Sequence, residues 1–327
     1  MKAAVLHNIN DLRYETVPDP VPGENETLIK IMAAGICGSD ISRVFDKGAY
    51  HYPIIIGHEF AGIDEKSGKK AVIFPLLPCM KCAMCRIGEY VCCENYDYYG
   101  SRRDGGFAEY LAVKNENILY IDGDMADISY DVLAMCEPAA IGLHCVYLAN
   151  VKIGDKVLIT GAGAIGLIMG YISKINGADK VYFVDIDKRK LDYAVSLGFD
   201  VYESKNTKNF DVFIEGTGVS SALETGLEAV KPFGNVVLMG NPSGDINISQ
   251  KSYWHILRKQ LALKGSWNSM FNLFRNEWRI VLDLIAGGKL PLENMISHRF
   301  KLEQCNEAFN VLKDRKEFVN RVMFVNY

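Results

Sequence analysis

A chain of 327 residues with 49% apolar and 23% charged residues has the length and composition of a globular protein with more than one core. The formal net charge of −4 offers no basic surface for nucleic acid, and the longest mostly apolar run, 162–172, contains glycines and cannot span a bilayer. Nine cysteines, an odd number and partly clustered, fit a reducing compartment better than secretion. We therefore expect a soluble cytoplasmic protein with neither nucleic acid nor membrane as partner.

The chain changes pattern near residue 156. Before that point, short strands such as 27–32 and 70–74 are separated by glycine and proline. After it, apolar strands alternate with helices, which predicts a parallel, doubly wound sheet covered on both faces. The expected strands are 157–160, 181–185, 200–202, 211–215, 236–239 and 261–265. The expected helices are 165–176, 188–197, 221–230 and 252–260, followed by helices 277–286 and 302–313 and a strand 321–326.

Four cysteines, Cys79, Cys82, Cys85 and Cys93, have the spacing C-x2-C-x2-C-x7-C. Thiolates this close on one loop can surround a zinc ion without help from other segments, and unrelated buried cysteines give no reason for two successive gaps of two residues. Cys92 competes with Cys93 as the fourth ligand. Because every ligand belongs to one loop, we expect a closed, structural zinc site.

A cysteine, a histidine and a carboxylate stand in three distant segments. Cys37 opens the sequence CGSD, His58 lies in GHE, and Glu137 precedes Pro138. Such donors can form a zinc site with a position left open for water or substrate. The histidine alone is unspecific, since a single histidine is more often a core or surface residue.

A glycine-rich turn with the sequence GAGAIG follows the strand at 157–160 and opens a helix. In a dinucleotide site, Gly161 allows the tight turn, Gly163 lets a pyrophosphate approach, and Gly166 allows helix and strand to pack closely. Ile165 completes the set of positions expected at the cofactor. A glycine turn that binds nothing is the alternative.

The acid that ends the next strand favours NAD. Asp185 stands nineteen residues after Gly166, where a carboxylate would accept hydrogen bonds from ribose hydroxyls and repel a 2′-phosphate. Lys190 and its basic neighbours are expected near the cofactor, and their positive charge leaves NADP as an alternative to NAD. Arg321 is either a pyrophosphate ligand or a solvated basic residue.

These elements resemble, in the same order, the zinc-dependent medium-chain alcohol and polyol dehydrogenases, and the resemblance covers essentially the whole chain. It implies a β-rich, chaperonin-10-like catalytic domain, 1–138 and 268–327, interrupted by a Rossmann domain, 139–267. It also implies that Cys37, His58 and Glu137 ligate a catalytic zinc, with Glu59 as an alternate ligand. Each chain would then carry two zinc ions. A glutamate as third ligand resembles the polyol dehydrogenase branch.

By the same resemblance, Ser39 begins a proton relay, although a serine there can equally be a turn or capping residue. Ser42 stands where many relatives end the relay with a histidine, so that route for the proton is in doubt. The family also implies a homodimer or homotetramer that pairs edge strands of the Rossmann sheet, here 261–265.

Three stretches, 75–79, 101–110 and 265–267, resemble the branch that oxidises galactitol 1-phosphate to tagatose 6-phosphate. Arginine suits phosphate recognition, and the candidate phosphate ligands, or else solvated surface charges, are Arg43, Lys47, Arg102 and Arg103. The chain is shorter than that branch between residues 62 and 69 and between 202 and 210, where we expect trimmed turns.

Three other functions are compatible with this sequence. An unphosphorylated polyol or secondary alcohol such as sorbitol, xylitol, butanediol or threonine could be the substrate. A zinc-free reductase of enones or quinones shares the fold, but the occupied positions Cys37, His58 and Glu137 argue against it. The third is a non-catalytic scaffold that binds NAD and zinc.

Overall fold

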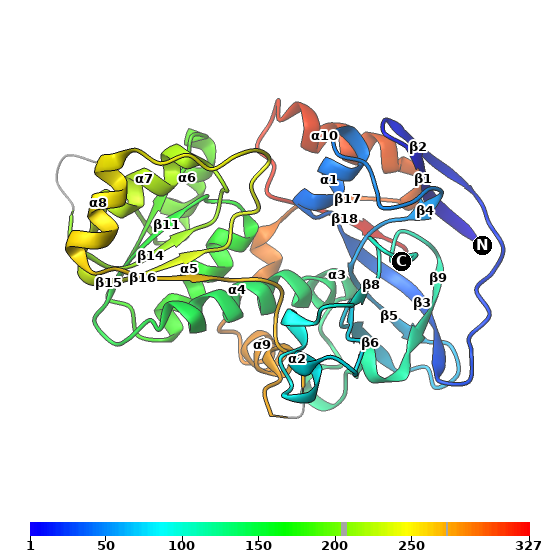
Figure 1. Ribbon diagram of the computed structural model, residues 1–327. Coiled ribbons are helices and arrows are strands. Elements are labelled where there is room, and N and C mark those ends of the chain that lie inside the picture. Colours follow the sequence, from blue (N-terminus) through cyan, green and yellow to red (C-terminus); the bar gives the residue numbers. More distant parts are fainter. Residues whose placement is uncertain (204–207, 273) are drawn as a thin grey trace. The chain divides into compact units, whose positions relative to one another are not determined.

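The computed structural model of this chain describes residues 1–203, 208–272 and 274–327, which divide into two compact units. Unit 1 consists of Met1–Pro138 and Met270–Tyr327, and unit 2 of Ala139–Ser269. The boundaries expected from the sequence are 138/139 and 267/268. Both termini belong to unit 1, and helix α4 (Cys136–Ala149) contains the first crossing (Figure 1).

Unit 1 is rich in short strands: β1 (Lys2–Asn8), β2 (Asp11–Thr16), β3 (Glu26–Gly35), β4 (Ile54–Ile55), β5 (Glu59–Asp64), β6 (Lys70–Ile73), β7 (Leu76–Leu77), β8 (Asp97–Tyr98), β9 (Tyr110–Lys114), β10 (Ile118–Tyr120), β17 (Ile296–Phe300) and β18 (Arg321–Val325). Its main sheet has the order β10-β6-β5-β3-β18-β17, and β9 also pairs with β3. Two smaller sheets have the orders β2-β1-β4 and β7-β8.

Strand β3 organises unit 1 because β5 and β18 pair with it antiparallel at the same end. Gly35, its last residue, lies opposite Glu59 in β5 and opposite Met323 in β18. These two registers bring the beginnings of β5 and β18 to the segment that follows β3. Aromatic rings fill the core nearby: the Phe107 ring packs edge-on against those of Phe309 and Phe324, with centroids 6.1 and 5.0 Å apart.

Unit 2 has the fold class expected from the sequence. Its strands are β11 (Lys156–Thr160), β12 (Lys180–Val184), β13 (Asp200–Val201), β14 (Phe210–Glu215), β15 (Val230–Leu238) and β16 (Ala262–Gly265), and its other helices are α5 (Ala164–Ile175), α6 (Lys188–Ser196), α7 (Ser220–Ala229) and α8 (Gln250–Lys259). All pairings are parallel, in the order β13-β12-β11-β14-β15-β16. The general right-handedness of parallel crossovers predicts that α5 and α6 cover one face and α7 and α8 the other. The order reverses between β11 and β14, where such sheets bind ligands.

The remaining helices belong to unit 1: α1 (Gly38–Phe45), α2 (Ala83–Arg86), α3 (Tyr130–Ala134), α9 (Glu277–Ala286) and α10 (Cys305–Asp314). The helix expected at 302–313 starts as a separate 3₁₀ turn, Leu302–Gln304, before α10. Across the three described ranges, no helix combines the length and the apolar character needed to cross a membrane.

One of the two shortened stretches is a tight turn. Between β5 and β6, the side chain of Asp64 accepts hydrogen bonds from the backbone N–H groups of Lys66 and Ser67 at 2.9 and 3.2 Å, which closes the connection in few residues. The second stretch, between Tyr202 and Phe210, includes residues 204–207, which lie outside the described residues.

Candidate metal centres and dinucleotide site

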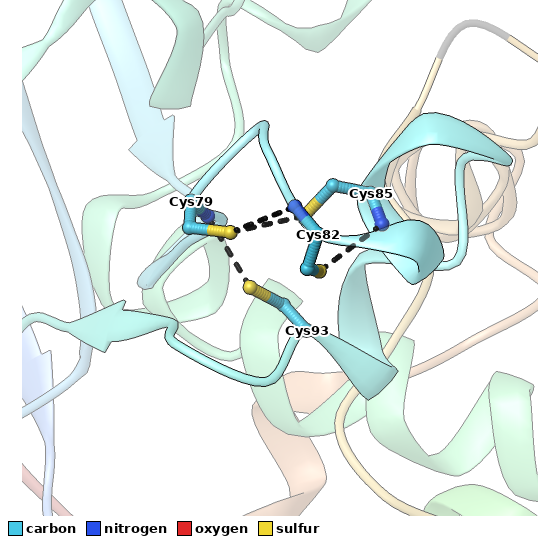
Figure 2. A group of neighbouring side chains, drawn as sticks. All are labelled: Cys79, Cys82, Cys85 and Cys93. Atoms are coloured by element: carbon cyan, nitrogen blue, oxygen red, sulfur yellow. Dashed lines mark hydrogen bonds between the residues drawn. The ribbon is translucent and has the colours of Figure 1, made fainter.

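The four closely spaced cysteines converge in unit 1 (Figure 2), and their sulfur atoms all lie within 4.8 Å of one another. Cys85 lies in α2, and Cys82 caps that helix. Cys93 follows a 3₁₀ turn and is buried, whereas Cys92 in that turn is exposed. The fourth thiol of the group is therefore that of Cys93.

Backbone N–H groups stabilise the thiolate form of this group. Cys79 Sγ accepts hydrogen bonds from the N–H groups of Lys81 and Cys82, at 3.5 and 3.4 Å. The backbone N–H groups of Cys85 and Glu94 lower the pKa of the Cys82 thiol to about 6, while burial raises the pKa of Cys85 to about 12. Thiolates this close repel one another unless a cation neutralises them, so the donor set fits a structural Zn²⁺.

A second group of metal-ligating side chains forms in unit 1 where β3, α1 and β5 meet. The ligand atoms of Cys37, His58 and Glu59 all lie within 4.8 Å of one another. Cys37 directly precedes α1, and the pairing of Gly35 with Glu59 brings the start of β5 beside it. Glycine at position 35 leaves room for this carboxylate, since a Cβ atom there would lie 2.3 Å from Glu59 Oε2.

Asp40 stands behind this group and is fully buried. Its Oδ2 accepts a hydrogen bond from the Cys37 backbone N–H at 3.1 Å, and its Oδ1 lies 3.5 Å from His58 Nδ1. Burial would raise the pKa of Asp40, but the charges and hydrogen bonds of His58 and Arg43 outweigh burial and lower it. The sequence shows Asp40 within CGSD but does not reveal this role.

The surroundings of His58 fit a divalent cation. Burial would lower the pKa of His58, but the charges of Asp40 and Cys37 raise it well above its usual value. His58 Nδ1 is buried and lies 3.5 Å from Asp40 Oδ1. A carboxylate behind the imidazole is a common partner of a zinc-bound histidine, and a thiol, an imidazole and a carboxylate are a zinc donor set.

Glu137, in the first turn of α4, approaches this group but is not part of it. Besides the four-cysteine group, the described residues contain one other set whose ligand atoms all lie within 4.8 Å of one another, and it consists of Cys37, His58 and Glu59. The carboxylate of Glu137 accepts a hydrogen bond from the Tyr98 hydroxyl at 3.3 Å. Burial and the charge of Glu59 raise the pKa of Glu137 to about 7, against the opposing effect of His58 and Arg321. Tyr98 was not a candidate from the sequence.

Arg321 lies in unit 1 and contacts a candidate zinc ligand. It begins β18, is only 5% exposed, and donates hydrogen bonds from Nη1 to Glu59 Oε1 and Oε2 at 3.0 and 2.8 Å and to the Ile36 carbonyl at 3.0 Å. The alternative of a solvated basic residue is wrong, because the pairing of β18 with β3 buries the side chain. Within unit 1 the side chain contacts Glu59, and no local sequence signal indicates this pairing.

Ser39 is hydrogen-bonded to an arginine. Arg43 Nη1 donates to Ser39 Oγ and to Asp40 Oδ1, each at 2.9 Å, one turn along α1. Ser42, also in α1, accepts at its carbonyl from the Lys47 backbone N–H at 2.8 Å. Ser39 Oγ therefore accepts a hydrogen bond from Arg43. Arginine donates hydrogen bonds but does not accept them, so Ser39 cannot pass a proton to Arg43.

The other candidate phosphate ligands differ in their pairing. Arg103 Nε lies 2.7 Å from Asp97 Oδ2, so a carboxylate already holds it. Arg102 donates from Nη1 to the Tyr96 carbonyl at 2.7 Å, and its guanidinium lies 4.2 Å from the centroid of the Tyr96 ring.

The glycine-rich turn of unit 2 follows β11 at the point where the strand order reverses. Gly161 has a φ of +92°, which favours glycine, and a Cβ at Gly166 would lie 1.9 Å from the Gly161 carbonyl oxygen. At Gly163 a Cβ would meet only Lys190 Nζ, at 3.9 Å, among the described atoms. The turn thus leaves space beside a helix N-terminus and a lysine, as a pyrophosphate requires. Ile165 lies in the first turn of α5.

Asp185, directly after β12, lies beside this turn. Its Oδ2 accepts a hydrogen bond from the Ala162 backbone N–H at 2.8 Å, and its Oδ1 accepts from the Asp187 N–H at 2.9 Å. The carboxylate therefore stands next to the turn with a fixed orientation, which suits recognition of a ribose.

Comparison with known proteins shows the family of this chain. Residues 23–123 match the family of the alcohol dehydrogenase GroES-like domain, and residues 164–287 match the zinc-binding dehydrogenase family. Galactitol 1-phosphate 5-dehydrogenase of Escherichia coli K12 is 34% identical over 317 residues, which cover 90% of this chain and 91% of that protein. The chain belongs to the zinc-dependent alcohol and polyol dehydrogenases.

Other members of this dehydrogenase family extend the comparison. L-galactonate-5-dehydrogenase of E. coli K12 is 30% identical, with 97% of each chain covered. The crystal structure of galactitol-1-phosphate dehydrogenase from E. coli superposes over the full length of both chains with a TM-score of 0.91 and 32% identity. The expected fold, a Rossmann domain joined to a GroES-like domain, is confirmed. Like the family, the chain is an oxidoreductase that acts on CH–OH groups, and its four-cysteine group is the structural zinc site.

Proposed function

We propose that this protein oxidises a secondary alcohol of a polyol phosphate with NAD, and that it converts galactitol 1-phosphate to tagatose 6-phosphate. The observation that carries the proposal is the meeting of Cys37, His58 and Glu59 within 4.8 Å, separate from the four-cysteine group. The name of the 34% identical E. coli relative supports the choice of substrate. Each chain would hold two zinc ions, one structural and one catalytic.

Cys37, His58 and a carboxylate of Glu59 or Glu137 would hold the catalytic Zn²⁺. That ion supplies a Lewis acid that makes an alcohol more acidic, and NAD accepts the hydride. Asp40 restrains the His58 ring and the Cys37 backbone.

The Ser39 hydroxyl can form a hydrogen bond with the substrate oxygen, which must lose its proton during the oxidation. Because Arg43 donates to Ser39 Oγ, the Ser39 O–H bond points away from Arg43 and can face the substrate oxygen. Arg43 cannot accept a proton, and Ser42 has no imidazole, so the proton leaves through another group or through water.

For the cofactor, the space at Gly163 and the carboxylate of Asp185 support NAD. Gly161, Ile165 and Gly166 shape the turn, and Lys190 would approach the phosphates. Solved structures with similar folds contain NADP or NADH, in a Sinorhizobium meliloti dehydrogenase and an E. coli one that are 26% and 25% identical.

The test is a panel of galactitol 1-phosphate, galactitol and sorbitol with NAD and NADP, followed as NADH or NADPH formation at the zinc-loaded enzyme. We expect the highest kcat/KM with galactitol 1-phosphate and NAD. Cys37→Ala should lose turnover and one zinc while retaining the other zinc and NADH binding. Wild-type oxidation rates in a Cys37→Ala protein that has been depleted of zinc would rule the mechanism out.

An unphosphorylated polyol is the second candidate substrate. Sorbitol dehydrogenase of Bombyx mori is 30% identical over 95% of both chains. In addition, Arg43 and Arg103 are already paired with carboxylates. A kcat/KM for sorbitol above that for galactitol 1-phosphate would favour this candidate.

We also propose that the protein forms a homodimer or homotetramer through β16. This strand is at one edge of the unit 2 sheet, and all four of its residues are exposed. In α8, Tyr253, Trp254 and Leu257 are exposed as well. An open strand edge beside apolar side chains suits pairing with a second copy. Light scattering should show an oligomer for the wild type. It should show a smaller species for Leu263→Lys, because the substitution places a charge in β16.

The cytoplasm is the proposed location. All nine cysteines are free thiols in the structure, and zinc ligands need reduced sulfur. Fractionation of the native host with a marker for each compartment tests this: recovery of the protein outside the cytoplasmic fraction would contradict it.

A further inference from the structure

A line of contacting side chains in unit 1 leads from the Cys37 group to the surface. The Tyr98 ring lies edge-on to His58 with centroids 5.7 Å apart, and the Tyr96 ring lies edge-on to Tyr98 at 6.2 Å. Next comes the Arg102 guanidinium, 4.2 Å from the Tyr96 ring centroid and 5.2 Å from that of Tyr50. Tyr50 is 71% exposed, whereas His58 is 5% exposed.

The position of Arg102 in this line is restrained from two directions. Its Nη1 donates to the Tyr96 carbonyl at 2.7 Å. The ring of His51, the neighbour of Tyr50, forms a hydrogen bond with the Arg102 carbonyl at 3.1 Å. These two hydrogen bonds connect Arg102 to the segments that carry Tyr96 and Tyr50. Because the guanidinium is already restrained, Arg102 loses less conformational entropy when it binds a ligand.

Arg102 differs from the other candidate arginines in its charge balance. Arg43 pairs with Asp40 at 2.9 Å and Arg103 with Asp97 at 2.7 Å. Among the described residues, no carboxylate pairs with the guanidinium of Arg102, whose one hydrogen-bond partner is the Tyr96 carbonyl. A guanidinium that stacks on aromatic rings keeps N–H groups at its edge, and these match a phosphate in a bidentate arrangement.

The structure of the proposed substrate also favours Arg102 over Arg43 as the phosphate ligand. In a hexitol 1-phosphate that is oxidised at carbon 5, the phosphate and the reacting carbon stand near opposite ends of the molecule. The phosphate ligand should then lie away from the zinc ligands. Arg43 contacts Ser39 and Asp40 and is too close to that group, whereas Arg102 is separated from His58 by Tyr96 and Tyr98.

We propose that Arg102, stacked between Tyr50 and Tyr96, binds the phosphate of the substrate and sets the preference for phosphorylated polyols. This proposal rests on the proposed function. The polyol chain lies along Tyr96 and Tyr98, with its reacting hydroxyl at the Cys37 group. Aromatic faces suit the C–H groups of a polyol.

The experiment compares Arg102→Gln and Arg102→Lys with the wild type on galactitol 1-phosphate and on galactitol. A charged hydrogen bond to phosphate corresponds to a loss of roughly 10- to 100-fold in kcat/KM for galactitol 1-phosphate in Arg102→Gln, mainly through KM. The kcat/KM for galactitol should be unchanged. Arg102→Lys should recover part of the loss, because it keeps the charge without the planar fork. Arg13→Gln, an exposed arginine paired with Asp11, is the matched control.

Two further measurements keep the test decisive. Tyr50→Leu should raise KM for galactitol 1-phosphate, while Tyr50→Phe should not, because it retains the ring; Tyr50 is exposed, so folding is not at risk. Inorganic phosphate should compete with galactitol 1-phosphate in the wild type and more weakly in Arg102→Gln. Equal losses on both substrates, or unchanged kinetics in both Arg102 variants, would overturn the assignment of Arg102. Failure of the wild type to oxidise any polyol phosphate, with zinc and NADH bound, would instead overturn the proposed function.

Discussion

Arg321 and Glu59 form a buried ion pair between residues 262 positions apart in the sequence, with Arg321 Nη1 at 3.0 and 2.8 Å from the two carboxylate oxygens. Glu59 is fully buried, and its ligand atom also lies within 4.8 Å of those of Cys37 and His58. The arginine therefore balances the charge of a carboxylate that belongs to the candidate zinc site. Both strands that carry the pair are held in register by β3.

Removal of one member of this pair should destabilise the protein strongly. Arg321→Met leaves Glu59 buried without its cation, at a cost of about 3–5 kcal/mol in the free energy of unfolding. Urea unfolding of the zinc-loaded proteins measures the loss. The double variant Arg321→Met/Glu59→Gln should lose less than the sum of the single variants, and strictly additive losses would show that the two side chains do not interact.

The structural zinc should depend on Cys82 but not on Cys92. Cys82→Ser removes a thiolate from the four-cysteine group, so the zinc content should fall by one equivalent per chain and the Tm should decrease. Cys92→Ser is the matched control, because Cys92 is exposed and lies outside the group. Elemental analysis of the purified proteins measures both. Loss of zinc from the Cys92 variant would mean that the fourth ligand is misassigned.

The preference for NAD should depend on Asp185. Asp185→Ser removes the carboxylate that would repel a 2′-phosphate, so the ratio of kcat/KM for NADP to that for NAD should rise by roughly tenfold or more. Asp192→Ser serves as the control, since Asp192 is an exposed residue of α6 that pairs with Lys188. An unchanged ratio in Asp185→Ser would exclude this carboxylate as the selective group.

The two later glycines of the turn should respond differently to alanine. In Gly163→Ala the new Cβ meets little protein, so the Tm should be retained while the Kd for NADH rises by about tenfold, because the methyl group occupies the space of the pyrophosphate. In Gly166→Ala the Cβ lies 1.9 Å from a backbone oxygen, so the loss of stability should be about 1–3 kcal/mol. Thermal unfolding and NADH fluorescence distinguish the two effects, and equal behaviour of the variants would contradict the prediction.

The stability of unit 1 should depend on pH through Asp131. Burial raises the pKa of this carboxyl, but hydrogen bonds from Ser129 and Arg299 outweigh burial and lower the pKa below its ordinary value of 3.8. Because the folded-state pKa is lowered, the stabilisation is complete above pH 3.8 and is lost as the pH falls through the folded-state pKa. Asp131→Asn should cost about 1–2 kcal/mol at pH 7, since Arg299 is partly exposed.

The difference in Tm between wild type and Asp131→Asn should shrink as the pH is lowered from 5 towards 3. Asp11→Asn provides the comparison, because Asp11 forms an exposed pair with Arg13. A constant difference across this pH range would show that Asp131 does not contribute through its charge.

Prediction from the sequence succeeded where the interacting residues are neighbours in the chain. The four thiols of Cys79, Cys82, Cys85 and Cys93 converge because short gaps and a helical turn leave them few other arrangements. The β/α alternation after residue 156 predicted the parallel sheet for a similar reason, since each unit packs against the next. The start of α10 was misjudged by three residues, as a 3₁₀ turn continues the helical pattern of the sequence.

Local patterns by themselves determined the zinc-binding loop, the dinucleotide turn and the class of the two domains, because these features depend on spacing within a few residues. Tertiary structure alone decided that Arg321 pairs with Glu59 and that Asp40 stands behind His58. It also decided that carboxylates pair with Arg43 and Arg103, whereas within the described ranges none pairs with Arg102. For Arg321 and Glu59 the physical reason is strand register: β5 and β18 meet β3 at Gly35, and a shift of one residue would turn either side chain to the other face of the sheet. The other contacts join α1 and loops that are distant in the sequence, so no local pattern encodes them.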